Sequence, residues 1–216
     1  MTCTEERFLH DVAKHEMHIV REDGISREIR FRAPDGSNCW FEIVTWPGCL
    51  CINGDHGSYV FSRIADMFEF FRHNGADAPE KPLYINEGYW SEKLQAAACD
   101  SASGESKVKN WSADAFRKHL EDGLERHLQS GGIGTPEEEE LREDIEELVN
   151  DAESDQRCAI ADAFHFDKHG LTFEDVYEWD CTEWNFHFIW CLYAIAWGIQ
   201  QYDKAKDGQV EPKVAA

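Results

Sequence analysis

The feature that most constrains this chain is an acid-rich stretch, residues 135–155, whose start carries several helix signals. Thr135 is suited to cap the first free amides, Pro136 fits the first helical position, and Glu138 stands where it completes a capping box. Apolar residues then recur at helical spacing: Leu141, Ile145, Leu148, Val149 and Ala152. The sequence therefore predicts a helix that packs through one narrow face and exposes carboxylates elsewhere.

The acids are concentrated in the second half of the chain. Of 216 residues, 43 are Asp or Glu and 21 are Lys or Arg, which gives a formal net charge of −22. Residues 111–216 carry 25 of these acids and 9 of the bases, a balance of −16. Such a field repels nucleic acids and anionic membranes and attracts basic protein surfaces. We therefore expect a basic protein partner, with no direct nucleic-acid or membrane binding.

The remaining composition is that of a folded, cytoplasmic protein. Apolar residues make up 42% of the chain, with 13 Phe and 8 Trp, which favours a packed core over disorder. The N-terminus lacks the basic lead and apolar run of a signal peptide, and the longest apolar stretch, residues 186–199, is too short to span a bilayer. Eight cysteines without a secretory signal indicate reduced thiols.

Alternating apolar residues between turn signals predict an antiparallel β-meander in the first part of the chain. The expected strands are residues 17–21, 26–32, 39–46, 49–52 and 59–61. Helices are expected at residues 4–14, 62–73 and 87–98. In the first of these helices, Thr4 is the expected cap, and Phe8, Leu9 and Val12 are expected to face inward.

The second part of the chain is expected to be helical. Small, polar residues at 99–111 predict a linker. Further helices are expected at residues 112–129, 135–155 and 155–167. Residues 182–202 are apolar nearly all round, which predicts a buried helix at the centre of this half. The predicted architecture is α+β: a sheet domain of four to five strands at 1–98, the linker, an acidic helical region at 112–207 and a frayed tail at 208–216.

Two groups of carboxylates form the predicted partner-binding surface. They are Glu137, Glu138, Glu139, Glu140, Glu143, Asp144, Glu147 and Asp151 in the first group, and Glu174, Asp175, Glu178, Asp180 and Glu183 in the second. If the two groups lie alongside each other, their charge density approaches that of duplex DNA, about one charge per 1.7 Å of axis. Aromatic residues in and beside the second group are of the kind enriched at protein interfaces: Phe173, Tyr177, Trp179 and Trp184. The alternative is a solvated helix face.

Signals for metal binding or catalysis are weak. Cys49 and Cys51 are expected on the same side of one strand, and His56 follows in the next turn, with Cys39 near enough in sequence to join them. The chain has no nucleophile elbow, no phosphate-binding glycine loop and no His-Glu-x-x-His pair. We therefore expect no catalytic residue, no cofactor and no metal. A metal-binding protein or enzyme that uses Cys49, Cys51 and His56 stays as an alternative.

Two neighbouring stretches carry a resemblance. They are residues 39–48, Cys-Trp-Phe-Glu-Ile-Val-Thr-Trp-Pro-Gly, and residues 54–71, which include Tyr-Val-Phe-Ser-Arg and Asp-Met-Phe-Glu-Phe-Phe. This region resembles accessory proteins of tailed phages and prophages of enteric and related bacteria. Such proteins often act against host defence, and acidic ones include DNA mimics that block CRISPR effectors or restriction enzymes, although the resemblance brings no catalytic residue with it.

The resemblance and the charge together predict an anti-CRISPR or anti-restriction protein of the DNA-mimic type. Its partner would be a basic nucleic-acid-binding protein in the cytoplasm of the host cell. A phage structural or assembly factor is a further alternative.

Overall fold

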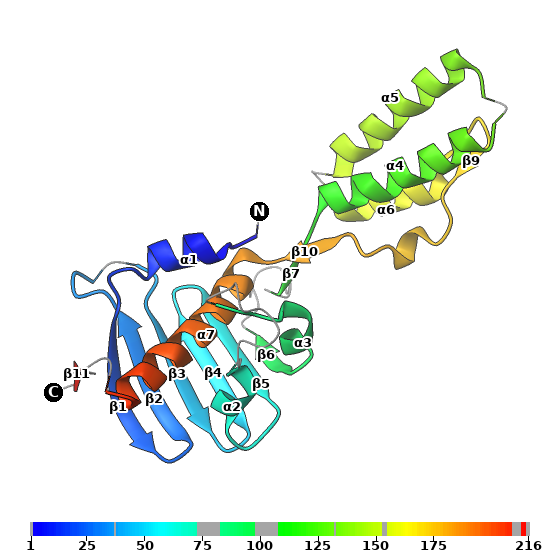
Figure 1. The fold of residues 1–216 in the computed structure, drawn as a ribbon. Coiled ribbons are helices and arrows are strands. Elements are labelled where there is room, and N and C mark those ends of the chain that lie inside the picture. The colour runs from blue at the N-terminus through cyan, green and yellow to red at the C-terminus, as the bar shows by residue number, and fades with distance from the viewer. Residues whose placement is uncertain are drawn as a thin grey trace. The chain divides into compact units, whose positions relative to one another are not determined.

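A computed structural model describes residues 2–36, 38–72, 83–97, 108–131, 133–152, 155–208 and 213–214 (Figure 1). The chain divides into two compact units. The first, here called the sheet unit, is Met1–Lys109 together with Trp184–Ala216, and the second, the inserted unit, is Asn110–Glu183. Of the expected linker at 99–111, residues 99–107 lie outside the described residues, and β7 (Lys109–Trp111) follows them.

Six antiparallel strands, paired in sequence order, form the sheet of the sheet unit. They are β1 (Glu16–Asp23), β2 (Ser26–Arg32), β3 (Phe41–Trp46), β4 (Cys49–Gly54), β5 (Gly57–Ser62) and β6 (Leu94–Ala97). A short β11 (Lys213–Val214), in the part expected as a frayed tail, pairs in parallel with β1. The predicted α+β class and the five predicted strands are confirmed.

The sixth antiparallel strand was not predicted. Residues 87–98 were expected to be helical, but the structure has a short α3 (Glu87–Ser91) followed by β6. The sequence of β6, Leu-Gln-Ala-Ala, has weak intrinsic strand preference, so its pairing with β5 decides its conformation. The helix expected at 62–73 is likewise shorter, α2 (Met67–Phe71), with Asp66 as its cap.

One face of the sheet carries the core. Ile29, Ile43, Ile52 and Tyr59 stand opposite one another across β2 to β5, and each is fully buried. The residues between them along each strand point to the other face, as the period of two requires.

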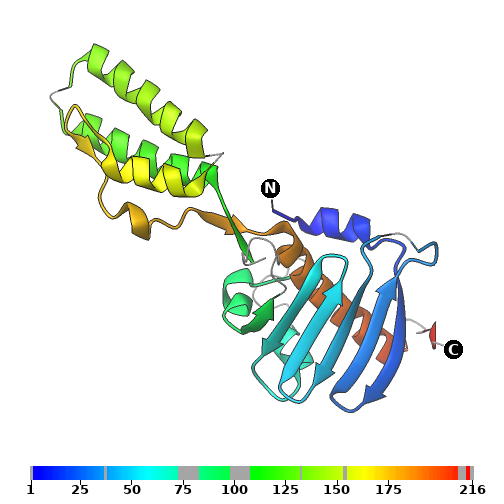
Figure 2. The same ribbon diagram turned by 180° about the vertical axis from the view of Figure 1, so that it is seen from behind.

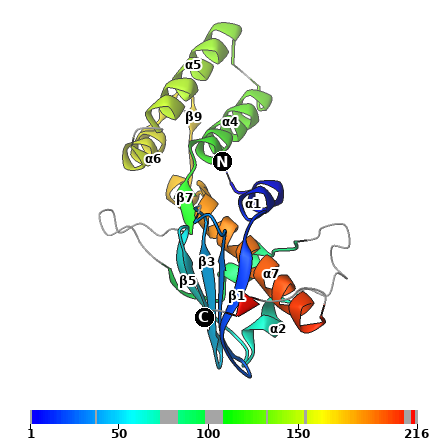
Figure 3. The ribbon, with the colours of Figure 1, turned by 90° about the vertical axis from the view of Figure 1, so that its left-hand side faces the viewer.

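A long helix, α7 (Phe186–Lys206), covers this core face together with α1 (Glu5–Asp11) and α2 (Figure 3). A Cβ on Gly198 would lie 2.7 Å from Ile43 Cδ1, which shows how closely α7 approaches the sheet. The expectation that this helix is buried is confirmed, but its expected place at the centre of the second half is wrong. An all-round apolar helix must be buried, yet its sequence does not say against which element.

The short α1 adds side chains to the same core. Thr4 caps it by accepting the Arg7 N–H at 3.2 Å, as predicted. Phe8 and Val12 are buried, whereas Leu9 is 37% exposed, which corrects the expectation that it faces inward. The reason is that Leu9 follows Phe8 by one residue, about 100° around the helix.

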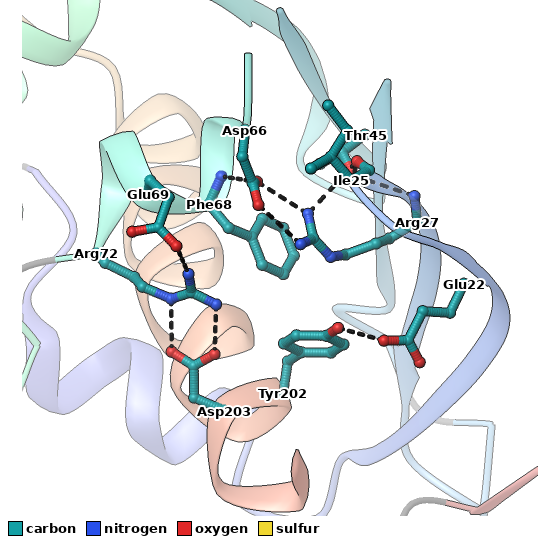
Figure 4. A network of polar contacts seen from close by, with 10 residues as sticks. All are labelled: Glu22, Ile25, Arg27, Thr45, Asp66, Phe68, Glu69, Arg72, Tyr202 and Asp203. Atoms are coloured by element: carbon teal, nitrogen blue, oxygen red, sulfur yellow. Dashed lines mark hydrogen bonds and ion pairs between the residues drawn. The ribbon is translucent and has the colours of Figure 1, made fainter. Parts of the chain in front are cut away.

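A buried ion pair joins β2 to the start of α2 (Figure 4). The Arg27 guanidinium donates to both carboxylate oxygens of Asp66, at 2.9 and 2.8 Å, and lies 4.5 Å from the centre of the Phe68 ring. Burial raises the pKa of Asp66, but the hydrogen bonds from Arg27 and from the Phe68 N–H outweigh it, so the pKa is lowered overall. The carboxylate therefore stays charged and holds α2 against the sheet.

Further polar contacts fix the C-terminal part of α7 (Figure 4). Arg72 donates to Asp203 at 2.9 and 2.7 Å. On the other side of the helix, Tyr202 and Lys206 each donate to Glu22 of β1 at 2.5 Å. These contacts fix the end of α7 against both α2 and β1.

The inserted unit has three helices and a core of its own. The helices are α4 (Ala113–Gln129), α5 (Thr135–Ala152) and α6 (Gln156–His165), followed by the hairpin β8 (Asp167–Lys168) and β9 (Leu171–Thr172) and the short helix η1 (Val176–Glu178). Ser112 caps α4 by accepting the Ala115 N–H at 3.2 Å, as predicted. The core residues include Phe116, Leu120, Leu124, Leu141, Ile145, Val149, Ala159 and Val176.

The start of α5 differs from the predicted cap by one residue. Thr135 is already helical, and the Gly134 carbonyl accepts the first intrahelical bond, from the Glu138 N–H at 3.0 Å. The Glu137 carboxylate accepts the Gly134 N–H at 2.6 Å, which is the reciprocal bond of a capping box. Gly134 is therefore the cap and Glu137 the third helical residue, in place of Thr135 and Glu138.

Two short strands join the inserted unit to the rest of the chain. β7 precedes α4, and β10 (Thr182–Trp184) precedes α7, and these strands pair with each other. The Ser112 N–H donates to the Cys181 carbonyl at 2.9 Å, and the Asn185 N–H donates to the Val108 carbonyl at the same distance. The inserted unit therefore begins and ends at adjacent points.

Among the residues that the structure describes, no helix combines the length and the apolar character that crossing a bilayer requires.

Candidate protein-binding surface

The acidic excess of the chain belongs mainly to the inserted unit. Residues 110–183 contain 22 Asp and Glu against 6 Lys and Arg, whereas the rest of the chain contains 21 against 15. The balances are −16 and −6, although the inserted unit is the smaller of the two. The predicted carboxylates therefore lie on a separately folded unit, and their individual partners decide which of them are available to bind.

One side of α5 is neutralised by α4. Arg142 of α5 donates to Glu138 at 2.9 Å and to Glu125 of α4 at 3.0 Å. Arg117 of α4 donates to Glu146 at 2.5 and 3.1 Å, and this hydrogen bond lowers the pKa of Glu146. Glu138, a predicted partner-binding residue, thus holds Arg142 in place, and Arg142 in turn joins α5 to α4.

The opposite side of α5 is neutralised by the β8–β9 hairpin. Lys168 donates to Asp144 at 2.5 Å, and the Asp144 side chain is only 14% exposed. His169 Nε2 lies 3.0 Å from Glu140 Oε2. Sequence reasoning missed these two side chains because it placed no hairpin there, although Gly170, with φ at +77°, marks the turn. Asp144 and Glu140 are thus occupied within the unit.

The outward side of α5 carries the available charge. Glu139, Glu143 and Glu147 follow one another at spacings of four residues and are exposed. Within the described part of the chain, they and Asp151 form no ion pair. We call Glu139, Glu143 and Glu147 the acidic row. Four helical residues rise about 6 Å, so the row presents one carboxylate per 6 Å along the helix.

The second predicted group lies on a different side of the unit. Glu174, Asp175, Glu178 and Asp180 are exposed and Glu183 is half-buried. Their segment packs against α6 and α4, and the two views in Figures 1 and 2 show α5 on the other side of this helix pair. The condition that the two groups lie alongside each other is therefore not met, because the β8–β9 hairpin reverses the chain and carries the second group to the opposite side.

The four aromatic residues in and beside the second group differ in their burial and surroundings. Phe173 is buried against α4, where its ring occupies the space that a Cβ on Gly123 would fill. Trp179 is half-buried and stacks on His119, with ring centroids 5.0 Å apart. Tyr177 is 67% exposed. Trp184 belongs to the sheet unit, where it packs against Phe188. Only Tyr177 of these four is largely available to a partner.

A wide groove runs along α4 on the side of the second group. It has a volume of about 800 Å³, and its lining includes His119, Asp122, Arg126, Glu174 and Asp175. Both signs of charge are therefore present in it. Arg126 donates to the Asp122 carbonyl of its own helix at 3.0 Å.

The metal candidates lie in the sheet unit and are not brought together. Cys49 and Cys51 alternate with the buried Leu50 and Ile52 along β4, so they point to the sheet face opposite α7. His56 instead lies 4.2 Å from the Trp190 ring of α7, and its Nε2 atom is 3.4 Å from Cys39 Sγ. Among the residues with a described position, no three His, Cys, Asp or Glu side chains are grouped as metal ligands.

His56 is held as a neutral imidazole. Burial is the main cause that lowers its pKa to about 4, and the neighbouring His187 lowers it further, against the opposing charges of Asp11 and Asp55. Burial also raises the pKa of the Cys39 thiol. The pair is therefore an uncharged thiol beside an uncharged imidazole. That state lacks the thiolate which nucleophilic catalysis by cysteine requires.

The fold and this surface together define an α+β protein with an acidic three-helix insertion. Comparison with protein-family models, with curated proteins and with solved structures found no match.

Proposed function

We propose that this chain is an acidic interaction protein that binds and inhibits a basic nucleic-acid-binding protein. The inserted unit occupies the surface on which that partner holds its nucleic acid, and its carboxylates take the place of phosphates. The resemblance of residues 39–71 to phage accessory proteins supports a host defence protein as the partner, either a CRISPR effector or a restriction enzyme. The action then takes place in the cytoplasm of the host cell.

The observation that supports this proposal is that the acids of the acidic row form no ion pair, whereas other acids of the inserted unit do. Glu139, Glu143 and Glu147 stand on one helix side and form no ion pair in the described structure. Mutual repulsion among such carboxylates lowers stability. Two cations of the unit, Arg142 and Lys168, form their ion pairs with other acids, so the row stays open to cations of a partner.

The charge spacing fits a partial mimic of nucleic acid. A single DNA strand carries one phosphate per about 3.4 Å of axis, and the acidic row offers one carboxylate per about 6 Å. The row therefore matches roughly every second phosphate of a strand. Contacts of this kind are mostly charge pairs with Lys and Arg, so affinity is expected to fall as salt rises.

The test is an affinity capture from bacterial lysate at low salt, followed by washes of rising salt and identification of the bound proteins. The captured partner is then purified and titrated with its nucleic acid in competition. We expect a basic nucleic-acid-binding protein that salt releases and that nucleic acid displaces. Reversal of Glu139, Glu143 and Glu147 to lysine should weaken binding at least tenfold.

A matched variant controls for net charge. Reversal of Glu6, Glu92 and Asp207 changes the charge by the same amount on exposed positions of the sheet unit, and it should change affinity much less. Binding that is insensitive to salt, or that survives reversal of the row, would contradict the proposal. A partner that is not displaced by nucleic acid would contradict the mimicry.

A further inference from the structure

Two aromatic side chains lie next to each other on the surface of the inserted unit. Tyr177 of η1 is 67% exposed and Phe164 of α6 is 49% exposed, the two highest values among the large apolar residues with described side chains. Their ring centroids are 5.2 Å apart. We call this pair the aromatic patch. Aromatic residues are typical of the centres of protein interfaces, where a few side chains supply most of the binding energy.

A preformed groove opens beside Tyr177. Its volume is about 320 Å³, and its lining includes Trp111, Ile160 and Trp179. Trp111 is fixed because its Nε1–H donates to the Ala152 carbonyl at 3.1 Å. Trp179 is fixed by its stack on His119. The walls therefore do not have to be ordered when a partner binds, which lowers the cost of binding.

One exposed carboxylate adjoins the aromatic patch in the chain. Glu178 follows Tyr177 in η1 and forms no ion pair in the described structure, whereas Asp162, two residues before Phe164, lies about 200° around α6 and so on its other side. The inserted unit as a whole has a charge balance of −16, which attracts cationic segments. Arg157 is the one Lys or Arg in the lining of the groove.

We propose that the aromatic patch and its groove bind an arginine-bearing segment of the basic partner. A guanidinium is planar, stacks on aromatic faces and pairs with carboxylates in the same plane, whereas an ammonium is a compact and strongly hydrated charge. An exposed Tyr–Phe pair offers aromatic faces for such stacking, and Glu178 beside Tyr177 offers a carboxylate. The surface therefore selects arginine over lysine, which a field of carboxylates alone does not.

This inference rests on the proposed function, because it assumes a basic partner. It assigns most of the binding energy to the aromatic patch, not to the acidic row. The acidic row belongs to α5, whereas the aromatic patch belongs to α6 and η1, and Figure 2 shows η1 on the side of α6 away from α5. The row then acts mainly on the rate of association, through its field, and the patch on the rate of dissociation. A partner that contacts the acidic row and the aromatic patch at once must hold the inserted unit in a cleft.

The test compares two labelled peptides of equal length and charge, oligo-arginine and oligo-lysine, for binding to the full chain by fluorescence anisotropy. We expect oligo-arginine to bind about two- to fivefold more tightly, the range of a cation–π contact at an exposed site. The double variant Phe164→Ser and Tyr177→Ser should remove this difference and leave oligo-lysine binding unchanged. Arg157→Gln should strengthen the binding of both peptides.

Each other outcome has a distinct meaning. Equal binding of the two peptides, or a preference that the double variant keeps, overturns the aromatic patch and leaves the charge-based function standing. No binding of either peptide at low salt contradicts the proposed function as well. Trp46→Ser, which removes a 41% exposed aromatic side chain from the sheet unit, controls for unspecific stacking and should keep the preference. The double variant should stay folded, since both side chains are largely exposed.

Discussion

At the scale of single residues, the surroundings of a side chain decide its role more than its type does. Eight of the thirteen predicted binding carboxylates lie on α5, yet Glu137 accepts the N–H of the cap residue Gly134, and Glu138, Glu140 and Asp144 are paired within the unit. Those four carboxylates therefore make contacts that stabilise the inserted unit. The remaining four lie on the outward side of α5, where the proposed partner would contact them.

His56 gives a residue-scale prediction for pH. Its pKa is about 4 in the folded chain and about 6.5 when unfolded. Between these values the unfolded chain binds more protons, so this residue contributes stability at pH 7 that is lost as the pH falls from about 6.5 to 4. We expect the melting temperature to fall between pH 7 and pH 5, and to fall less in His56→Phe, measured by circular dichroism at constant salt.

A second variant distinguishes the protonation of His56 from its contact with the Cys39 thiol. Cys39→Ala removes the thiol beside His56 and keeps the imidazole, so its melting temperature should keep the dependence on pH. If His56→Phe and the original chain depend on pH equally over this range, the burial of a neutral imidazole is not the cause.

At the scale of elements, β3 and β4 approach so closely at one end that only glycine fits. A Cβ on Gly54 would lie 2.2 Å from the Trp40 carbonyl oxygen and 2.8 Å from Phe41 Cα, both backbone atoms that cannot turn aside. Gly54→Ala should therefore lower the free energy of unfolding by about 3 kcal/mol, at the upper end of the cost of overpacking. Denaturant unfolding measures the change.

Gly88 supplies the matched control. A Cβ there would meet no atom within 4 Å, and alanine restricts the unfolded chain, so Gly88→Ala should be neutral or stabilising by up to about 1 kcal/mol. A similar loss of stability in both variants would mean that the close approach at Gly54 is not what makes alanine costly.

Elements with local signals could be predicted from the sequence, and elements placed by distant contacts could not. Ser112 and the spacing of Phe116, Leu120 and Leu124 were sufficient for α4, because a cap and a helical stripe are local. By contrast, the burial of α7 against the sheet depends on strands more than a hundred residues earlier. The opposite placement of the two acidic groups depends on the β8–β9 hairpin, whose two-residue strands give almost no pattern.

At the scale of the whole molecule, the chain is a sheet unit interrupted by a second folding unit. Among the described residues, the two cores, one around Ile43 and Trp190 and the other around Phe116 and Leu141, share no residue. The predicted division into 1–98 and 112–207 differs from this arrangement, since Trp184–Ala216 returns to the sheet unit. A buried helix beyond the insertion completes the core that the first strands begin.

This organisation predicts that the insertion can be removed. Replacing residues 112–181 by a short Gly-Ser linker should leave the sheet unit folded, with a change in free energy of unfolding of about 1 kcal/mol or less, since the Ser112 N and Cys181 O atoms are already 2.9 Å apart. Denaturant unfolding and circular dichroism provide the measurement. On the proposed function, the shortened chain should also no longer bind a basic partner. Failure of the shortened chain to fold would show that the units depend on each other.

The pairing of β7 with β10 also affects how the sequence of such a chain can change in evolution. Because the two ends of the inserted segment are already adjacent, one recombination event can exchange that segment without any new strand pairing in the sheet. Mutations that retune the charge or the aromatic residues of the insertion leave the packing around α7 untouched. If the inserted unit is the binding unit, as proposed, its recognition properties can change while the sheet unit stays the same.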